Sequence, residues 1–154
     1  VELRNATRIL GLGEPVCLGL PDGGLTECEG ELTVLLADLV ASGPKGTWCA
    51  ATWRGDGHPD HEAVGRSAAS AVAGAGATLL EFPVWMWHWA RPDDDAVPWD
   101  RMSMAPFDRG ALDRKRQAAA VFQTQVEPFE AGVDAVLPPF VLQRLFAVGE
   151  AVIL

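Results

Sequence analysis

Apolar residues recur along the chain with two different spacings. Leu32, Leu35, Leu36, Leu39 and Val40 fall on one face of a helix with 3.6 residues per turn. Shorter apolar runs that are rich in β-branched and aromatic residues, bounded by glycine or proline, are typical of buried strands instead. On these two patterns we expect helices over 1–10, 32–40, 61–75, 111–125 and 139–147, and strands over 15–20, 47–53, 78–85 and 151–154.

The order of these elements predicts the fold class. Strands that alternate with helices indicate an α/β protein with a mostly parallel sheet and helices on both faces, a three-layer α/β/α arrangement. The 154 residues of the chain suit a single domain over 1–154. Functional sites in such sheets lie in the loops that follow the carboxyl ends of the strands. The loop after the predicted strand 47–53 is therefore the first place to look for chemistry.

Charge and composition narrow the classes of partner. The chain carries 12 Lys and Arg against 21 Asp and Glu, a formal net charge of −9. Such an acidic chain is expected to bind nucleic acid and anionic lipid poorly. No apolar run reaches the ~20 residues that a membrane helix needs. Its three cysteines lack any C-x-x-C spacing, which excludes a disulfide framework and a cysteine zinc knuckle. We therefore expect reduced thiols, a cytoplasmic location and a small-molecule partner.

The loop Gly55–Glu62 concentrates polar groups that are suited to catalysis. It holds His58 and His61, two of the three histidines of the chain. Two imidazoles three residues apart at the entrance of a helix can share one concave site, one binding a metal while the other faces a substrate. Asp56 and Asp60 can orient these rings by accepting a ring N–H. The alternative is a polar helix start at which Asp60 caps the backbone.

Several segments together resemble one enzyme family. The string GDGHPDHEAVGR at 55–66 resembles a signature of the LmbE-like, or PIG-L-type, de-N-acetylases. Further similar segments follow this family in the same order: 18–25, 81–92, 114–125 and 136–150. The resemblance implies a Rossmann-like α/β fold. It also implies zinc-dependent hydrolysis of an N-acetyl or other acyl group on an amino sugar or related glycoconjugate, with iron or cobalt as alternative metals.

The resemblance also implies roles for three residues of this loop. His61 matches the zinc ligand, and His58 matches the histidine that stabilises the tetrahedral oxyanion or protonates the leaving amine. Asp60 matches the carboxylate that orients His58. His58 and Asp60 are thus the catalytic candidates and His61 the metal-binding candidate.

Substrate contacts are expected from Asp22, Asp56 and Trp87. Asp22 matches a position that contacts sugar hydroxyls in the family, although Pro-Asp-Gly is also an ordinary turn. Trp85, Trp87, Trp89 and His88 could form an aromatic wall against a sugar ring or a lipid-like aglycone. Alternation places the three tryptophans on one face and Met86 and His88 on the other. Packing in the core is the alternative.

The family's first signature, His-Pro-Asp-Asp-Glu, has no counterpart in the sequence. In the family it supplies the other two zinc ligands and the general base. Arg91–Asp95 looks similar, but a guanidinium has no acceptor and cannot replace the ligand histidine. The chain also starts at Val1 rather than Met, directly in a helical pattern. We therefore expect an N-terminally incomplete deacetylase domain that lacks the first strand and helix of the fold.

Two alternatives to a deacetylase fragment remain open. A catalytically incomplete homologue would act as a carbohydrate- or protein-binding module, and open sheet edges with an aromatic patch would favour a homo-oligomer. A metal-dependent hydrolase could also recruit ligands from His88 or from a neighbouring chain.

Overall fold

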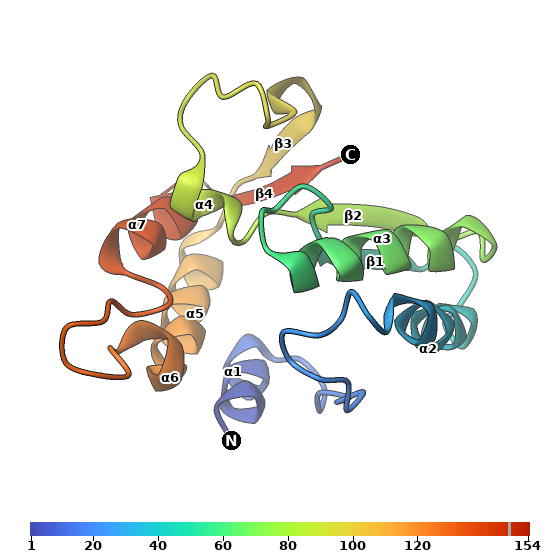
Figure 1. Ribbon diagram of the computed structural model, residues 1–154, viewed down its shortest axis with the longest axis horizontal. Helices are drawn as coiled ribbons and strands as arrows, with labels where there is room; N and C mark the ends of the chain where they lie inside the picture. Colours follow the sequence, from blue (N-terminus) through green and yellow to red (C-terminus); the bar gives the residue numbers. More distant parts are fainter. Residues whose placement is uncertain (148) are drawn as a thin grey trace. The chain divides into compact units, whose positions relative to one another are not determined.

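The computed structural model describes residues 1–147 and 149–154 and contains helices and strands in roughly alternating order (Figure 1). The elements are α1 (Glu2–Leu10), α2 (Glu29–Ala41), β1 (Trp48–Thr52), α3 (Pro59–Ala73), β2 (Thr78–Phe82), α4 (Met86–Trp89), η1 (Trp99–Arg101), β3 (Met102–Ala105), α5 (Arg109–Ala120), α6 (Gln123–Val126), α7 (Pro139–Ala147) and β4 (Glu150–Ile153). Contacts along the chain divide it into two compact units. We call 18–104 with 151–154 the sheet unit, and 1–17 with 105–150 the helical unit.

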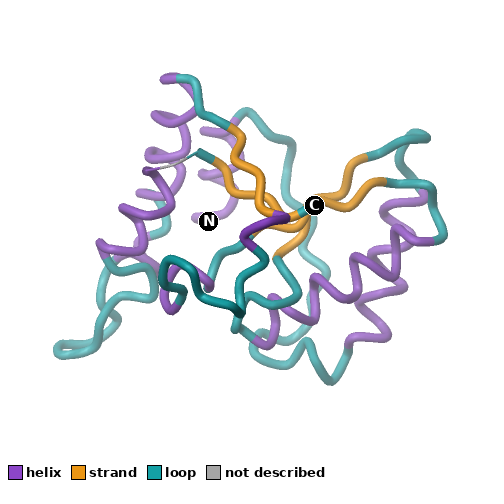
Figure 2. The backbone as a smooth tube through the Cα atoms, turned by 90° about the horizontal axis from the view of Figure 1, so that it is seen from above, coloured by secondary structure: helices purple, strands orange, loops and turns teal. Residues whose placement is uncertain are grey.

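A four-stranded sheet runs in the order β1-β2-β4-β3; its strands are the orange segments of Figure 2. β1 and β2 are parallel and in register from Trp48↔Thr78 to Thr52↔Phe82. β4 lies antiparallel to β2, with Glu81 opposite Ile153. The α/β class is therefore confirmed, with a mixed sheet. The mostly parallel, Rossmann-like arrangement in three layers stays a prediction.

Helix α3 packs against β1 and β2 within the sheet unit. Its inward face carries small side chains, among them Ala63 and Ala68, which are buried. Gly65 makes the closest approach, because a Cβ atom there would lie 2.5 Å from the carbonyl oxygen of Thr52. The helix therefore sits directly on the carboxyl end of β1, and its first residues are held beside the loop that follows this strand.

Helix α2 packs along α3 and is joined to it by an ion pair. Arg66 of α3 donates to both carboxylate oxygens of Glu29 at 2.7–3.2 Å. The guanidinium is the main cause that lowers the pKa of Glu29. This pair is partly exposed, so it orients the helices more than it stabilises them.

The hydrophobic core of the sheet unit lies around the short helix α4. Trp53, Met86, Ala90, Val97 and Ile153 form the buried cluster, and the partly buried Trp87, Trp89 and Met102 pack against it. Met86 is completely buried. The core therefore anchors the segment that follows β2, which returns to the loop after β1.

The helical unit is built on the contact between α1 and α5. Ala6 and Ala118 are buried in these two helices. The carboxylate of Glu2 accepts hydrogen bonds from the backbone N–H (3.1 Å) and the hydroxyl (2.6 Å) of Thr124. The start of α1 is thereby fixed to the start of α6.

Three expectations about individual elements are wrong. Residues 15–20 form no strand: Gly19 has φ 77°, which breaks an extended chain, and Val16 is 73% exposed. β2 ends at Phe82 rather than at residue 85. The predicted helix 111–125 divides into α5 and α6. Between residues 91 and 108, for which no element was expected, the chain forms η1 and β3. In the part of the chain that the structure describes, no helix has the length and apolar character needed to cross a bilayer.

Candidate functional site

The loop between β1 and α3 is held in one shape by backbone constraints. Gly57 has φ 83°, and a Cβ atom there would lie 2.7 Å from Nε1 of Trp89. The same indole nitrogen donates to the carbonyl oxygen of Asp56 at 2.9 Å. Pro59 occupies the first turn of α3, where its missing N–H costs nothing. Thr52, the last residue of β1, donates its hydroxyl to the carbonyl oxygen of His61 at 2.8 Å.

The imidazole of His61 is oriented by a buried carboxylate. Its Nδ1 lies 2.5 Å from Oδ2 of Asp56. A carboxylate only accepts hydrogen bonds, so the shared proton resides on Nδ1 of His61. The lone pair of neutral His61 is therefore on Nε2, which is the arrangement that a metal-binding histidine requires.

The imidazole of His58 has the opposite tautomer. Its Nδ1 accepts the backbone N–H of Asp60 at 3.3 Å, which makes His58 the N-cap of α3. When neutral, the ring therefore carries its proton on Nε2 and can donate there. The rings of His58 and His61 stack with centroids 4.5 Å apart and planes inclined by 26°. The loop thus presents one imidazole with an acceptor nitrogen beside one with a donor nitrogen.

Asp56 is completely buried, and both of its carboxylate oxygens accept hydrogen bonds from within the fold. Its carboxylate accepts from His61 and from three backbone N–H groups, those of Val84 (2.8 Å), Trp85 (2.7 Å) and Met86 (3.0 Å). Burial alone would raise the pKa of Asp56, but these four hydrogen bonds outweigh it and hold the pKa below its ordinary value. Of the two roles expected for Asp56, the structure shows the orienting contact with a ring nitrogen, that of His61; the same carboxylate also caps the start of α4, and its four donors leave no oxygen free for a substrate.

Asp60 is buried as well and binds a different turn. Its carboxylate accepts the backbone N–H of Gly23 at 2.6 Å and that of Leu25 at 3.1 Å. Asp60 thus meets His58 through its own backbone N–H, while its carboxylate fixes the Pro21–Leu25 turn. This turn carries Asp22, whose side chain is exposed beside the start of α3. The structure therefore places the Asp22 turn next to the histidine loop.

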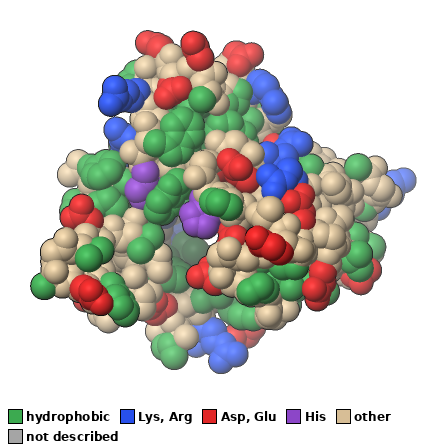
Figure 3. Space-filling view, viewed as in Figure 1, with side chains coloured by type: hydrophobic (Ala, Val, Ile, Leu, Met, Phe, Trp, Pro, Cys, Tyr) green, Lys and Arg blue, Asp and Glu red, His purple; other side chains and the backbone are tan. Residues whose placement is uncertain are grey.

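The expected tryptophan wall is wrong, because 86–89 is a helix rather than a continued strand. Trp87 and Trp89 pack against the core. Trp85 lies instead in a row of rings: its indole meets His58 edge-on with centroids 5.4 Å apart and stacks on His88 at 3.9 Å. Histidine side chains reach the surface beside hydrophobic ones (Figure 3).

Pro83 is the sequence signal that β2 ends early, because proline cannot continue a ladder of strand hydrogen bonds.

The residues at this loop fit one position of a metal site. Nε2 of His61 has the tautomer of a ligand, whereas the side chains of Asp56 and Asp60 are occupied by other donors. Within residues 1–147 and 149–154, no three His, Cys, Asp or Glu side chains are grouped to hold an ion. A ligand set for zinc is therefore not assigned to these residues.

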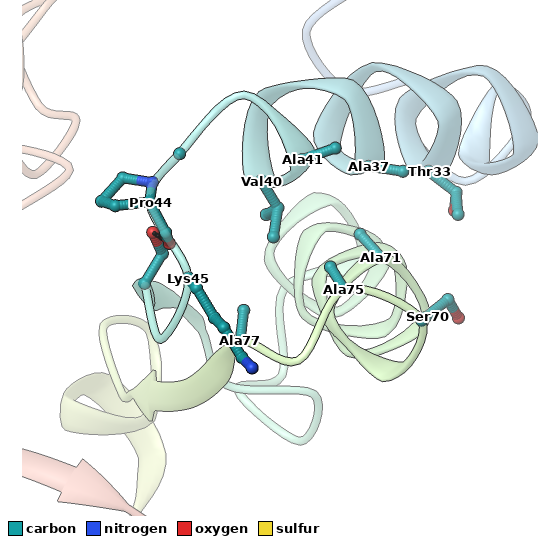
Figure 4. A pocket seen from close by; sticks show the side chains of 13 residues that line it. Thr33, Ala37, Val40, Ala41, Pro44, Lys45, Ser70, Ala71, Ala75 and Ala77 are labelled. Carbon is teal, nitrogen blue, oxygen red and sulfur yellow. Dashed lines mark hydrogen bonds between the residues drawn. The ribbon is translucent and has the colours of Figure 1, made fainter.

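A separate pocket of about 610 Å³ lies in the sheet unit, away from the histidines (Figure 4). Small side chains of α2 and α3, such as Ala37 and Ala71, face one another across it, and Lys45 supplies its charge. Its lining contains no histidine or carboxylate. It therefore offers no acid–base pair of the kind that the β1–α3 loop presents.

Comparisons with protein-family models, with curated proteins and with solved structures give no match to this chain.

Proposed function

We propose that the chain carries the histidine part of a metal-dependent N-deacetylase site of the LmbE-like type, on a Rossmann-like α/β domain. The substrate class is an N-acetylated amino sugar or a related glycoconjugate. The observation that carries the proposal is the stacked pair His58 and His61 with opposite tautomers, each fixed by a separate hydrogen bond. Structural loops do not need this division between a donor and an acceptor imidazole, whereas amide hydrolysis uses both.

Each residue has a defined part in this proposal. His61 offers the Nε2 lone pair to zinc, and zinc supplies Lewis-acid polarisation of the amide carbonyl and an acidified water when it is bound. His58 donates its Nε2–H to the oxygen on which negative charge develops, or delivers that proton to the leaving amine. Asp60 holds the turn of Asp22 against this loop, where the Asp22 carboxylate can accept sugar hydroxyls. The general base and the further metal ligands are not assigned.

The test uses the full product of the coding sequence, purified without added metal. Bound zinc is measured by elemental mass spectrometry, and acetate release is measured with N-acetylglucosamine and its glycosides. We expect His61→Ala to lose both bound zinc and acetate release. We expect His58→Gln to keep zinc and to release acetate about 10²–10⁴-fold more slowly, the usual effect of removing a general acid. Asp95→Asn, at an exposed loop carboxylate, serves as the control and changes neither.

The same experiment separates the proposal from a binding module. A product that holds no zinc and releases no acetate from any N-acetylated sugar would overturn the deacetylase proposal. Saturable binding of these sugars without turnover would then favour a carbohydrate-binding role for the same loop.

A further inference from the structure

The carboxylate of Asp56 accepts hydrogen bonds from two separate segments of the chain. Its Oδ2 meets Nδ1 of His61 and the backbone N–H of Trp85, while its Oδ1 meets the N–H groups of Val84 and Met86. The residues that it joins are 28–30 positions away in the chain. One buried carboxylate therefore connects the loop after β1 with the segment after β2.

The segment that Asp56 fixes is the one that contacts His58. Trp85 is the N-cap residue of α4, and its ring meets the ring of His58 edge-on at 5.4 Å between centroids. The ring of His61 stacks on His58 at 4.5 Å. His58 thus contacts two rings, and both of these residues are hydrogen-bonded to the carboxylate of Asp56.

We propose that Asp56 is the positioning residue of the site, which sets the tautomer of His61 directly and the placement of His58 through Trp85. This inference rests on the proposed function for its catalytic meaning, but its structural content can be measured without turnover. It assigns Asp56 a role different from the substrate contact expected from the sequence, because a buried carboxylate with four donors has no oxygen left for a sugar hydroxyl.

The substitution Asp56→Asn distinguishes orientation from simple burial. Asparagine keeps the size of the side chain but has one acceptor oxygen and an NH₂ group. If the oxygen stays on the N–H groups of Val84 and Met86, the NH₂ group takes the place of Oδ2, beside the N–H of Trp85 and Nδ1 of His61. Nδ1 must then accept, and the proton of His61 moves to Nε2. The lone pair needed by a metal is lost, although no atom of His61 has been changed.

Glu81 provides the matched control. It is also a buried carboxylate of the sheet unit, and its oxygens accept hydrogen bonds from the backbone and guanidinium of Arg54 at 2.7–3.0 Å rather than from a histidine. Glu81→Gln removes a buried charge, as Asp56→Asn does, but should leave the imidazole tautomers unchanged. A general loss of stability would change the imidazole spectra of both variants. A specific loss of the orientation of His61 would change only those of Asp56→Asn.

The experiment is long-range ¹H–¹⁵N correlation spectroscopy of the imidazoles in the metal-free, ¹⁵N-histidine-labelled protein, which has three histidines to assign. We expect wild type and Glu81→Gln to show His61 protonated on Nδ1, and Asp56→Asn to show it protonated on Nε2. Zinc titration of the full product of the coding sequence should show about 10–100-fold weaker binding for Asp56→Asn, the usual cost of removing a hydrogen-bond partner of a ligand.

Two results would overturn the inference. Wild-type His61 with its proton on Nε2 would do so without any variant, even if Asp56→Asn failed to fold. An Asp56→Asn protein that folds, keeps the Nδ1–H tautomer and binds zinc as Glu81→Gln does would also do so. If instead the tautomer and zinc affinity change as expected and no acetate is released by wild type, the positioning role stands and the deacetylase proposal fails.

Discussion

At the residue scale, the two buried aspartates of the histidine loop are not equivalent. Asp60 fixes a turn 35–37 residues away through two backbone N–H groups, whereas Asp56 fixes the start of α4 and the ring of His61. The two aspartates lie four residues apart in the chain, yet the carboxylate of each connects a different pair of segments. Substitutions at the two positions should therefore have separable effects.

We predict that Asp60→Asn lowers the free energy of unfolding while Asp22→Asn does not. Asparagine at position 60 can serve one of the two backbone N–H groups with its oxygen, and leaves the other facing an NH₂ group. Loss of a buried charge-assisted hydrogen bond costs about 1.5–3 kcal/mol. Asp22 is exposed on the turn itself, so it makes a matched control. Urea unfolding followed by tryptophan fluorescence checks this, and equal midpoints for both variants would contradict it.

A second prediction concerns the cysteines. Burial raises the pKa of the Cys49 thiol, because the thiolate loses its hydration in β1. The thiolate is the reactive form, so a raised pKa means less of it at a given pH and slower alkylation. We expect iodoacetamide at pH 8 to label the exposed Cys17 well before Cys49. The rate at Cys49 should continue to rise as the pH passes above 9. Peptide mass spectrometry measures both rates, and faster labelling of Cys49 would refute the prediction.

Sequence reasoning at this scale identified the residues of the loop but not their partners. His58, His61, Asp56 and Asp60 lie together, as their spacing predicted. The expected pairing of the Asp60 carboxylate with His58 differs from the structure, in which that carboxylate accepts backbone N–H groups of the Pro21–Leu25 turn. The sequence alone does not show these contacts, because they depend on backbone N–H groups of other segments. Trp85 was missed as a neighbour of His58 for the same reason: its direction depends on where β2 ends.

At the element scale, local signals predicted helices better than strands. α1, α3 and α7 follow their patterns within about two residues, because an amphipathic helix satisfies its own backbone. A strand needs a partner, and the sequence does not state which neighbour will pair. Residues 15–20 have an apolar composition but form no strand. After β2 the chain turns into α4 at Met86, where the carboxylate of Asp56 accepts the backbone N–H groups at the start of this helix.

The contact between α3 and β1 gives the prediction that belongs to this scale. A Cβ atom at Gly65 would lie 2.5 Å from the Thr52 carbonyl oxygen and 3.0 Å from the Arg54 nitrogen, both backbone atoms that cannot move alone. We expect Gly65→Ala to lower the free energy of unfolding by about 1–3 kcal/mol, the usual cost of overpacking.

Gly30 of α2 is the control for this change. A Cβ atom there meets nothing within 4 Å, so Gly30→Ala should stabilise the helix by up to about 1 kcal/mol through its higher helix propensity. Because α3 carries the histidines at its start, Gly65→Ala should also change the imidazole spectra, which Gly30→Ala should not. Equal unfolding free energies for the two variants would refute the close contact.

At the scale of the whole molecule, the order of elements in the sequence predicted the α/β class. It did not predict that the chain divides into two compact units. The helical and sheet units interleave: the chain passes between them after residues 17, 104 and 150. Two of these passages lie inside strands, since β3 ends at Ala105 and β4 begins at Glu150. No local pattern signals such interleaving, which is a property of long-range contacts.

This interleaving predicts that the two units unfold together. Met86 of the sheet unit and Val141 of the helical unit are both completely buried. Met86→Ala should cost about 2–5 kcal/mol through the cavity that it leaves, and Val141→Ala should cost less because fewer atoms are removed. Since β3 and β4 each continue from one unit into the other, loss of packing in either unit should weaken the same sheet. We therefore expect each variant to lower one common transition, with coincident curves from tryptophan fluorescence and far-ultraviolet circular dichroism. Two separate transitions, of which Val141→Ala shifts one and Met86→Ala the other, would show instead that the units fold independently and that the histidine site depends on the sheet unit alone.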